Sequence, residues 1–303
     1  MTEFEIRPRG PFSLTAAQDF AGGFPAGIGG GSVGEQSIAM AFPIEGTDSS
    51  AAVDIRQRED GVLVVRTDAP PALLEAVQRQ ATRSLSLDHD GTDWPAVGQR
   101  DPVIGRLQQA HGFLRPVCFY SAYEAATSFV IGQRISMRQS ARIKQWLGEQ
   151  FGDRPTVGGV EFIAFPRPKR LFEMDAVPGL NQKKVGWLKA IAGATLGGRL
   201  DTERLRAMAR EEALARLQRM PGIGPFTAEA VWLRGCGMVD ELPSSEEVSL
   251  TAARDMYGRP EMSRDQMVEL AEEWRPFRMW ATVLLRVGWG RQFGRQSYRQ
   301  PSK

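Results

Sequence analysis

The sequence has very few of the residues that build metal and redox centres. Only two cysteines, Cys118 and Cys236, and two histidines, His89 and His111, occur among its 303 residues. Two cysteines cannot form a four-cysteine zinc or iron–sulfur site, and they do not indicate a disulfide framework. We therefore expect a protein of the reducing cytoplasm without a redox cofactor, and we assign the isolated histidines no role.

Long apolar segments are missing as well. No stretch approaches the roughly 18 consecutive apolar residues of a membrane-spanning helix. The first ten residues, MTEFEIRPRG, carry no apolar run after their charges and do not resemble a signal peptide, so we expect no membrane partner. The net charge of +2 is a weak indication of a polyanionic partner, although the interspersed basic and acidic residues still allow a local basic face.

The first 92 residues predict a small α+β domain with an antiparallel sheet. The segments Ser37–Ile44, Ala51–Gln57 and Val62–Arg66 favour strands and are separated by turns of Gly, Asp and Ser. A helix is expected to follow Pro70–Pro71 and to run to about Leu85, because apolar residues recur there at helical spacing.

Helix breakers separate this domain from a largely helical remainder. The glycine-rich run Gly22–Gly34 predicts a loop, and Asp88–Arg100 (DHDGTDWPAVGQR) predicts a linker. Beyond about residue 101, apolar residues recur at helical spacing, for example along Tyr123–Val130 and Phe277–Leu284. This pattern predicts a compact helical body of about 200 residues.

The strongest local motif is Met220–Ala228 (MPGIGPFTA), which joins two predicted helices. Its glycines allow a tight turn with exposed amides, and Pro225 suits the first turn of the second helix. Amides at the start of a helix bind phosphate oxygens without reading base sequence. A fainter copy of this chemistry occurs at Val177–Leu180 (VPGL). Taken alone, either turn could equally be an ordinary helix–helix connection.

Residues around these turns resemble the helix-hairpin-helix (HhH-GPD) DNA glycosylases. The resemblance is greatest to their alkylation-repair branch, the 3-methyladenine DNA glycosylase II type. It covers about residues 120–290 in matched order and spacing, and more loosely Gly10–Phe24, which resembles an extra N-terminal domain of that branch. The four stretches that carry it are Ser128–Ser136 (SFVIGQRIS), Val177–Ala192 (VPGLNQKKVGWLKAIA), Leu217–Gly235 (LQRMPGIGPFTAEAVWLRG) and Trp274–Leu285 (WRPFRMWATVLL).

The resemblance implies an α+β N-terminal domain, residues 1–92, followed by a two-subdomain all-helical body, residues 93–303. The central subdomain would span about residues 119–239, and the second would combine about residues 93–118 with residues 240–303. The cleft between them would hold a base flipped out of double-stranded DNA. Such proteins usually act alone, so we expect a cytoplasmic, nucleoid-associated bacterial monomer.

In this family an Asp shortly after the hairpin helix, following a Pro, stabilises the oxocarbenium-like sugar while the glycosidic bond breaks. The matching stretch here, Leu242–Leu250 (LPSSEEVSL), contains no Asp. Counting forward from Pro243 assigns the acidic position to Glu246, whereas counting back from Leu250 assigns it to Glu247. We favour Glu247, with Glu246 close behind; both could instead be favourable acids in the first turn of a helix.

The resemblance also implies a base pocket. Bifunctional members carry a Lys two residues after the second hairpin glycine, where this chain has Phe226, so no amine is available there for a Schiff base and no lyase activity is expected. Phe226 would stack on the flipped base, with Phe129 and Trp280 nearby. Arg286 replaces a frequent pocket aromatic. It would either donate to the base, which disfavours a cationic alkylpurine, or pair with one of the two glutamates.

Further roles follow from the same alignment of motifs. Gln133–Arg134 falls where the family inserts a wedge side chain, and the Arg134 guanidinium could stack on bases or remain a solvated helix-end charge. The carbonyls of Pro221 and Ile223 could ligate a monovalent cation. The predicted phosphate contacts are Gly222, Ile223, Gly224, Phe226, Thr227, Lys183 and Lys184, with Lys189, Arg138, Arg142 and Lys144 as further candidates.

We therefore predict a monofunctional DNA glycosylase that removes a modified base and leaves an abasic site, in base excision repair of alkylated bases. One alternative is the excision of a bulky or polar base, such as a hypermodified phage cytosine, in defence. The shifted carboxylate, Arg134 and Arg286 motivate that alternative. The other is a catalytically inert module that binds distorted DNA, which the missing Asp motivates.

Overall fold

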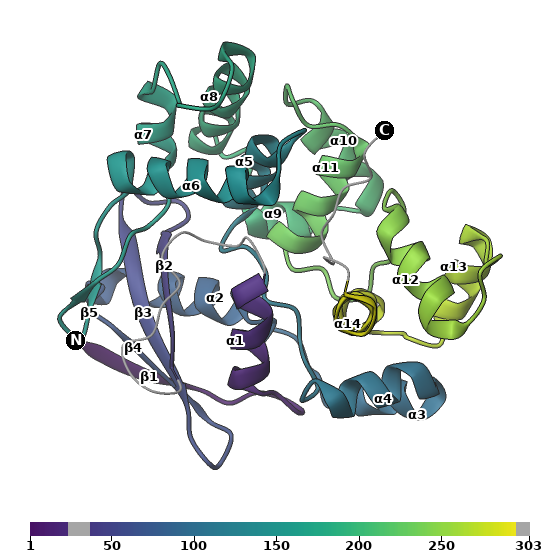
Figure 1. The fold of residues 1–303 in the computed structure, drawn as a ribbon. Coiled ribbons are helices and arrows are strands. Elements are labelled where there is room, and N and C mark those ends of the chain that lie inside the picture. Colours follow the sequence, from purple (N-terminus) through teal and green to yellow (C-terminus); the bar gives the residue numbers. More distant parts are fainter. Residues whose placement is uncertain (24–36, 295–303) are drawn as a thin grey trace.

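The beginning of the chain forms a four-stranded antiparallel sheet in a computed structural model that describes residues 1–23 and 37–294 (Figure 1). The strands β1 (Thr2–Ile6), β2 (Ser37–Pro43), β3 (Ser50–Gln57) and β4 (Leu63–Thr67) lie in the order β1-β4-β3-β2. The three predicted strands are therefore confirmed. The polar segment TEFEI of β1, which the sequence pattern does not predict, pairs with β4 from Thr2 opposite Thr67 to Ile6 opposite Leu63.

The helix predicted after Pro70–Pro71 is also confirmed. A short 3-10 turn at Pro71–Leu73 leads into α2 (Leu74–Ser84), whose Val77 and Ala81 are buried. Among the described residues of this domain, a further helix is α1 (Leu14–Gly23), and residues 24–34 of the predicted glycine-rich loop lie outside the described residues.

The predicted linker Asp88–Arg100 is partly wrong, because α3 (Trp94–Arg100) forms within it. Pro95 is compatible with the first turn of a helix, so it does not break this one. Trp94 is fully buried and packs edge-on against the rings of Phe277 and Trp280. Tertiary burial of one indole therefore outweighs the local breaker signals.

The rest of the described chain, up to residue 294, forms the predicted helical body. In Figure 1 the helices α5 to α11 lie above and beside the sheet, while α12 to α14 lie on the right with α3 and α4. Within the described residues, no helix is long and apolar enough to cross a membrane.

The exact limits of the predicted domains stay a prediction. The bounds are α4 (Pro102–Ala110), α5 (Ala122–Gly132), α6 (Met137–Phe151), the small strands β5 (Thr156–Val157) and β6 (Val160–Glu161), α7 (Pro168–Glu173), α8 (Gln182–Leu196), α9 (Thr202–Arg206), α10 (Arg210–Gln218), α11 (Pro225–Ala230) with a π-helical turn at Val231–Gly235, α12 (Glu247–Tyr257), α13 (Arg264–Glu272) and α14 (Arg278–Phe293).

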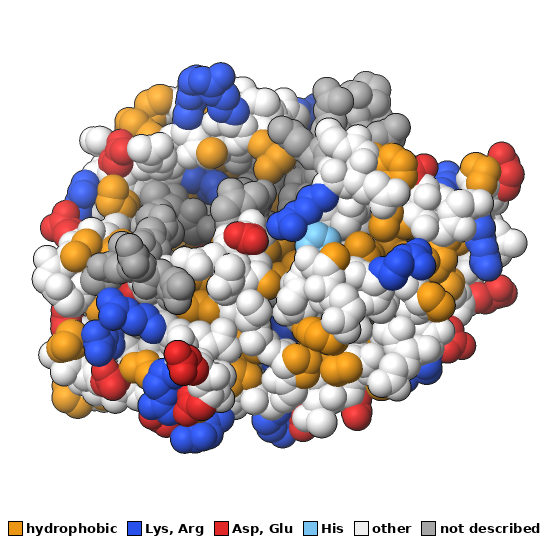
Figure 2. All heavy atoms as spheres, turned by 60° about the horizontal axis from the view of Figure 1, so that its bottom comes forward, with side chains coloured by type: hydrophobic (Ala, Val, Ile, Leu, Met, Phe, Trp, Pro, Cys, Tyr) orange, Lys and Arg blue, Asp and Glu red, His pale blue; other side chains and the backbone are white. Residues whose placement is uncertain are grey.

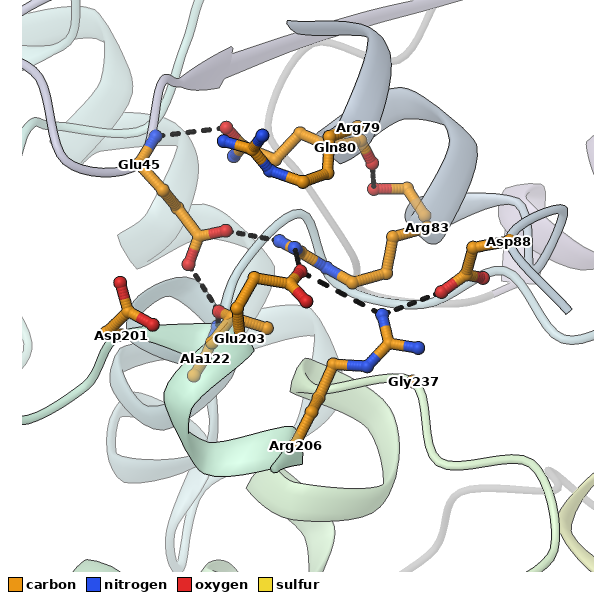
Figure 3. Close-up of polar contacts among 12 residues, drawn as sticks. Glu45, Arg79, Gln80, Arg83, Asp88, Ala122, Asp201, Glu203, Arg206 and Gly237 are labelled. Atoms are coloured by element: carbon orange, nitrogen blue, oxygen red, sulfur yellow. Dashed lines mark hydrogen bonds and ion pairs between the residues drawn. The ribbon is translucent and has the colours of Figure 1, made fainter. Parts of the chain in front are cut away.

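A polar network joins the sheet domain to the helical body (Figure 3). Arg83 of α2 is 1% exposed and pairs with Glu45, which follows β2, and with Glu203 of α9 at 2.7 Å. Arg206 of α9 pairs in turn with Asp88 at 2.6 Å. Burial acts to lower the pKa of Arg83, but the two carboxylates outweigh it and raise that pKa. The guanidinium therefore stays charged, and its ion pairs to Glu45 and Glu203 favour one orientation of the two parts.

Candidate active site

The motif Met220–Ala228 forms the predicted hairpin between α10 and α11. Gly222 has a φ of +84°, and a Cβ there would come within 2.6 Å of the Trp187 ring, so this position requires glycine. Gly224 has a φ of −85°, and a Cβ there would meet nothing within 4 Å. The outer side of the turn at Gly224 is therefore open to a ligand, while the buried Ile223 holds the turn to the core.

The other Pro-Gly turn repeats this geometry between α7 and α8. Gly179 has a φ of +83°, close to that of Gly222. The amide of Leu180 donates to the carbonyl of Val177 at 3.0 Å, as the amide of Ile223 does to Met220 at 3.2 Å. The internal echo in the sequence thus corresponds to a repeated turn.

The C-terminal end of α5 lies against the hairpin turn and the start of α8. Gln133 donates from its side-chain amide to the carbonyl of Gly222 at 2.8 Å, and Lys184 of α8 donates to the carbonyls of Ile131 and Gln133. Arg134 follows with a φ of +56°, a left-handed conformation that is uncommon outside glycine, and its side chain is exposed. Of the two wedge candidates, Arg134 therefore projects outward, whereas Gln133 is engaged with the hairpin.

The predicted phosphate-contacting lysines differ in how far they are engaged. Lys183 is exposed, with its ammonium 5.3 Å from the centroid of the Trp187 ring. The ammonium of Lys184 donates to two carbonyls at the end of α5. Burial, together with the charge of Arg134, lowers the pKa of Lys184. Lys189 pairs with Asp175 at 3.1 Å. Lys183 is therefore the best placed of the three for a phosphate.

The candidates on α6 also separate. Arg138 and Arg142 are exposed, but Lys144 is only 3% exposed and faces away from solvent. Burial lowers the pKa of Lys144 to about 8, against the opposing effect of Glu124. Lys144 is consequently a structural group, and its interpretation as a phosphate contact is corrected. On the face in Figure 2, seen from below Figure 1, basic side chains of the described residues are interspersed with acidic ones and form no continuous patch.

Two half-buried aromatic rings lie where the hairpin helix meets α5. The rings of Phe129 and Phe226 are 6.5 Å apart and nearly perpendicular. Phe119 packs on the other side of Phe129 at 5.4 Å. Because both Phe129 and Phe226 retain some exposed surface, they can offer an aromatic edge or face to a bound ring.

The two candidate glutamates lie in different environments. Glu246 precedes α12 as its N-cap residue, and its side chain is 15% exposed. It accepts hydrogen bonds from the Ser249 hydroxyl at 2.6 Å and from Arg286 of α14. The Glu247 side chain is 62% exposed and pairs with Arg264 of α13. Only Glu246 therefore faces the interior between α12 and α14.

Two pocket candidates lie on α14 but do not face the same surroundings. Arg286 is 8% exposed and forms the ion pair with Glu246, which is one of the two alternatives foreseen for it. Trp280 is 2% exposed and stacks with Phe277 at 4.8 Å. Arg115 lies over the Trp280 ring at 4.9 Å. Arg286 thus adjoins the candidate carboxylate, while Trp280 packs in a separate aromatic cluster.

Sequence reasoning missed Glu229 of α11, which is 3% exposed and binds the loop before Glu246. A signal was available, because a Glu stands among buried apolar residues in a hairpin helix. Such a residue needs several donors to offset its desolvation.

The residues that could hold a metal are few. Within residues 1–23 and 37–294, no group of three or more His, Cys, Asp and Glu side chains could bind an ion. The carbonyls of Pro221 and Ile223 remain a predicted site for a monovalent cation. Their turn is ordered by the hydrogen bond from the Ile223 amide to Met220 and by Gln133, and these two bonds use other carbonyls of the turn.

Known proteins provide sequence relatives of this chain, although no protein-family model matches it. It is 26% identical over 208 residues to a DNA-3-methyladenine glycosylase of Bacillus subtilis, covering 66% of this chain and 68% of the relative. It is 32% identical over 190 residues to DNA-3-methyladenine glycosylase 2 of Escherichia coli. That match covers 60% of this chain and 62% of the relative, so it spans less than two thirds of the Escherichia coli protein.

Solved structures share the whole fold. The 3-methyladenine DNA glycosylase from Archaeoglobus fulgidus superimposes with a TM-score of 0.76 at 21% identity, covering 97% of this chain and all of that one. The 8-oxoguanine glycosylase/lyase of Clostridium acetobutylicum, bound to double-stranded DNA, gives 0.67 at 16% identity, covering 97% and 99%. The fold is therefore that of the helix-hairpin-helix DNA glycosylases.

In both sequence and fold, the chain is therefore similar to the AlkA-like 3-methyladenine DNA glycosylases. The two relatives named above are 3-methyladenine DNA glycosylases, and the shared fold has an N-terminal sheet followed by a helical body.

Proposed function

We propose that this protein is a monofunctional DNA glycosylase that flips a modified base out of duplex DNA and hydrolyses its N-glycosidic bond. The observation that carries the proposal is the position of Glu246. It is the partly buried carboxylate at the start of α12, adjoining the interior beside the hairpin region. A carboxylate in such surroundings can stabilise positive charge that develops on a sugar as its glycosidic bond breaks.

The remaining roles follow from the surroundings of Glu246. Exposed amides of the hairpin turn would hold the DNA backbone, and Arg134 would fill the gap left by the flipped base. Phe226 and Phe129 would contact the extruded base, and stacking on these rings would limit the orientation of the base. Water would attack C1′ of the deoxyribose, with Glu246 stabilising the oxocarbenium-like sugar.

The proposed absence of lyase activity rests on Phe226. An aromatic side chain at this position cannot form a Schiff base with the sugar, which is how bifunctional members cut the strand. Borohydride treatment of enzyme mixed with abasic-site DNA measures this directly. We expect no covalent protein–DNA adduct, and a trapped adduct would contradict the monofunctional assignment.

The first experiment measures free base released from duplexes that carry methylated purines, by wild type, Glu246→Gln and Glu247→Gln. We expect release by wild type, loss of about 100-fold or more in rate for Glu246→Gln, and little change for Glu247→Gln. The two substitutions are matched in chemistry and adjacent in sequence, so a fall confined to Glu247→Gln would reassign the carboxylate. DNA binding without release from any substrate would favour the inert binding module.

The ion pair between Arg286 and Glu246 favours a second candidate substrate class. A carboxylate already paired with a guanidinium attracts a cationic alkylated purine less than a lone carboxylate does. Arginine N–H groups would instead donate to an uncharged base with several acceptors, such as a hypermodified cytosine. Including hypermodified phage DNA in the same release assay tests this candidate. Release only from that DNA would replace alkylation repair by a role in defence.

A further inference from the structure

One buried carboxylate holds the loop that leads to Glu246. Glu229 of α11 accepts the backbone amides of Ser244 at 2.8 Å and Ser245 at 2.9 Å. It also accepts both serine hydroxyls, that of Ser244 at 2.6 Å. Two consecutive peptide units of the loop are thus fixed to one side chain directly before the candidate catalytic residue.

Arg210 of α10 completes this arrangement. Its guanidinium pairs with Glu229, donates to the Ser244 hydroxyl at 3.1 Å, and pairs with Glu241 at 2.8 Å. Its flat face lies 5.6 Å from the centroid of the Trp232 ring. Arg210 and Glu229 belong to the two helices of the hairpin, so the hairpin and the loop are joined through these two side chains.

The chemistry of Glu229 indicates a carboxylate that stays ionised. Burial acts to raise its pKa, but the four hydrogen bonds from Ser244 and Ser245 outweigh burial and lower it. An ionised carboxylate binds backbone amides more strongly than a neutral amide side chain can. The Ser244 and Ser245 side chains are exposed, so their hydrogen bonds to Glu229 tie an exposed loop to a buried side chain.

We propose that Glu229 is a positioning residue for Glu246 and that Arg210 holds Glu229 in place, an inference that rests on the proposed glycosylase function. The path of residues 243–245 sets where α12 begins and hence where the Glu246 carboxylate lies. Misplacement of a catalytic group by about 1 Å can lower a rate 100-fold. Glu229 therefore fixes the distance between the hairpin that would hold the DNA strand and the carboxylate that would act on its sugar.

The test compares Glu229→Gln with wild type in single-turnover base release and in binding to a duplex with an abasic-site analogue. Gln keeps the size of the side chain but presents an NH₂ group to the loop donors. We expect the release rate to fall by about 10- to 100-fold, while the dissociation constant changes by less than about 3-fold. Glu212→Gln, on the exposed face of α10, is the matched control and should behave as wild type.

A double-mutant cycle separates positioning from general stability. Ser244→Ala with Ser245→Ala removes the hydroxyl partners of Glu229, so its effect on the release rate and that of Glu229→Gln should be clearly less than additive. Additive effects, or a wild-type release rate in correctly folded Glu229→Gln, would overturn the proposal.

Hydrogen exchange in the absence of DNA gives a readout that needs no substrate. The amides of Ser244 and Ser245 should exchange faster in Glu229→Gln than in wild type, with the amides of α13 unchanged. Unchanged exchange at both serines would overturn the proposal even if wild type releases base. If wild type releases no base from any DNA, the proposed function fails, and positioning fails with it, although faster exchange would still show that Glu229 holds the loop.

Discussion

Gln133 donates its side-chain amide to the carbonyl of Gly222, so the end of α5 and the hairpin turn are joined at 2.8 Å. The two groups come from segments far apart in the chain. The contact orders the turn from inside, because it satisfies a carbonyl of the turn itself. The outer amides of the turn stay available to a ligand.

Replacing Gly222 by Ala should destabilise the protein much more than replacing Gly224. At Gly222 the φ of +84° costs an L residue about 1–2 kcal/mol, and the new methyl group would clash with Trp187. At Gly224 the backbone is ordinary and the space is open, so we expect a change within about 0.5 kcal/mol. Urea unfolding measures both variants. Equal losses would contradict the strained geometry assigned to the turn.

Arg83→Met should lower the free energy of unfolding by about 1–3 kcal/mol, because it removes the cation that two partly exposed carboxylates share. Glu45 and Glu203 would then face each other across the join between the sheet and the helices. Thermal unfolding followed by circular dichroism provides the measurement. Arg79→Met, on the exposed side of α2, is the control and should lose less than about 0.5 kcal/mol. A loss as small as the control's would mean that the network contributes little.

Stability should rise with pH above neutrality through Lys144. The pKa of its ammonium is about 8 in the folded protein, against 10.5 for an unperturbed lysine side chain. Protonation of Lys144 is therefore disfavoured in the folded protein. Below about pH 8 the folded protein carries the full cost of this buried charge, and the cost disappears as pH rises toward 10.5. The contribution has a maximal slope of about 1.4 kcal/mol per pH unit.

Urea unfolding of wild type at pH 7.5, 8.5 and 9.5, against a Lys144→Met and Glu124→Leu double variant, isolates this contribution. The double variant removes both members of the buried pair and should lack the rise. Parallel pH curves for the two proteins would show that Lys144 is protonated equally in the folded and unfolded states.

Arg286→Gln should change which base is preferred. Removing the guanidinium leaves Glu246 with the Ser249 hydroxyl, which favours a cationic alkylated purine over an uncharged modified base. We expect the ratio of the two release rates to shift by about 10-fold toward the cationic base. Competition between the two duplexes in one reaction measures this ratio. A uniform fall for both bases would instead assign Arg286 to holding Glu246.

Much of the fold follows from local patterns, and the exceptions have physical causes. The strands β2 to β4 are predictable because their apolar residues are bounded by turn residues. β1 is mostly polar and becomes a strand only by pairing with β4. α3 is hidden among breaker residues and exists because Trp94 is buried against α14.

The candidate site is predictable as a set of segments, but the roles of single residues are not. Relative to the family motif, the stretch between Pro243 and Leu250 has one extra residue. Counting from one end therefore selects Glu246 and counting from the other selects Glu247, so the sequence alone does not decide between them. They differ only once α12 begins, because one side chain then faces Arg286 and the other faces Arg264. The resemblance likewise assigns both Trp280 and Arg286 to the base pocket, although the Trp280 ring packs against Trp94, which lies early in the chain.

The cross-links at the end of α5 have a mechanical consequence. Lys184 and Gln133 join three segments there, the α5 terminus, the hairpin turn and the start of α8, through hydrogen bonds to main-chain carbonyls. Segments connected in this way resist moving separately, because any relative shift breaks bonds to groups that have no freedom to follow. Such a surface keeps its shape when a partner binds, so the partner has to bend instead. The free energy of bending is then lost from binding, and partners that bend easily are favoured.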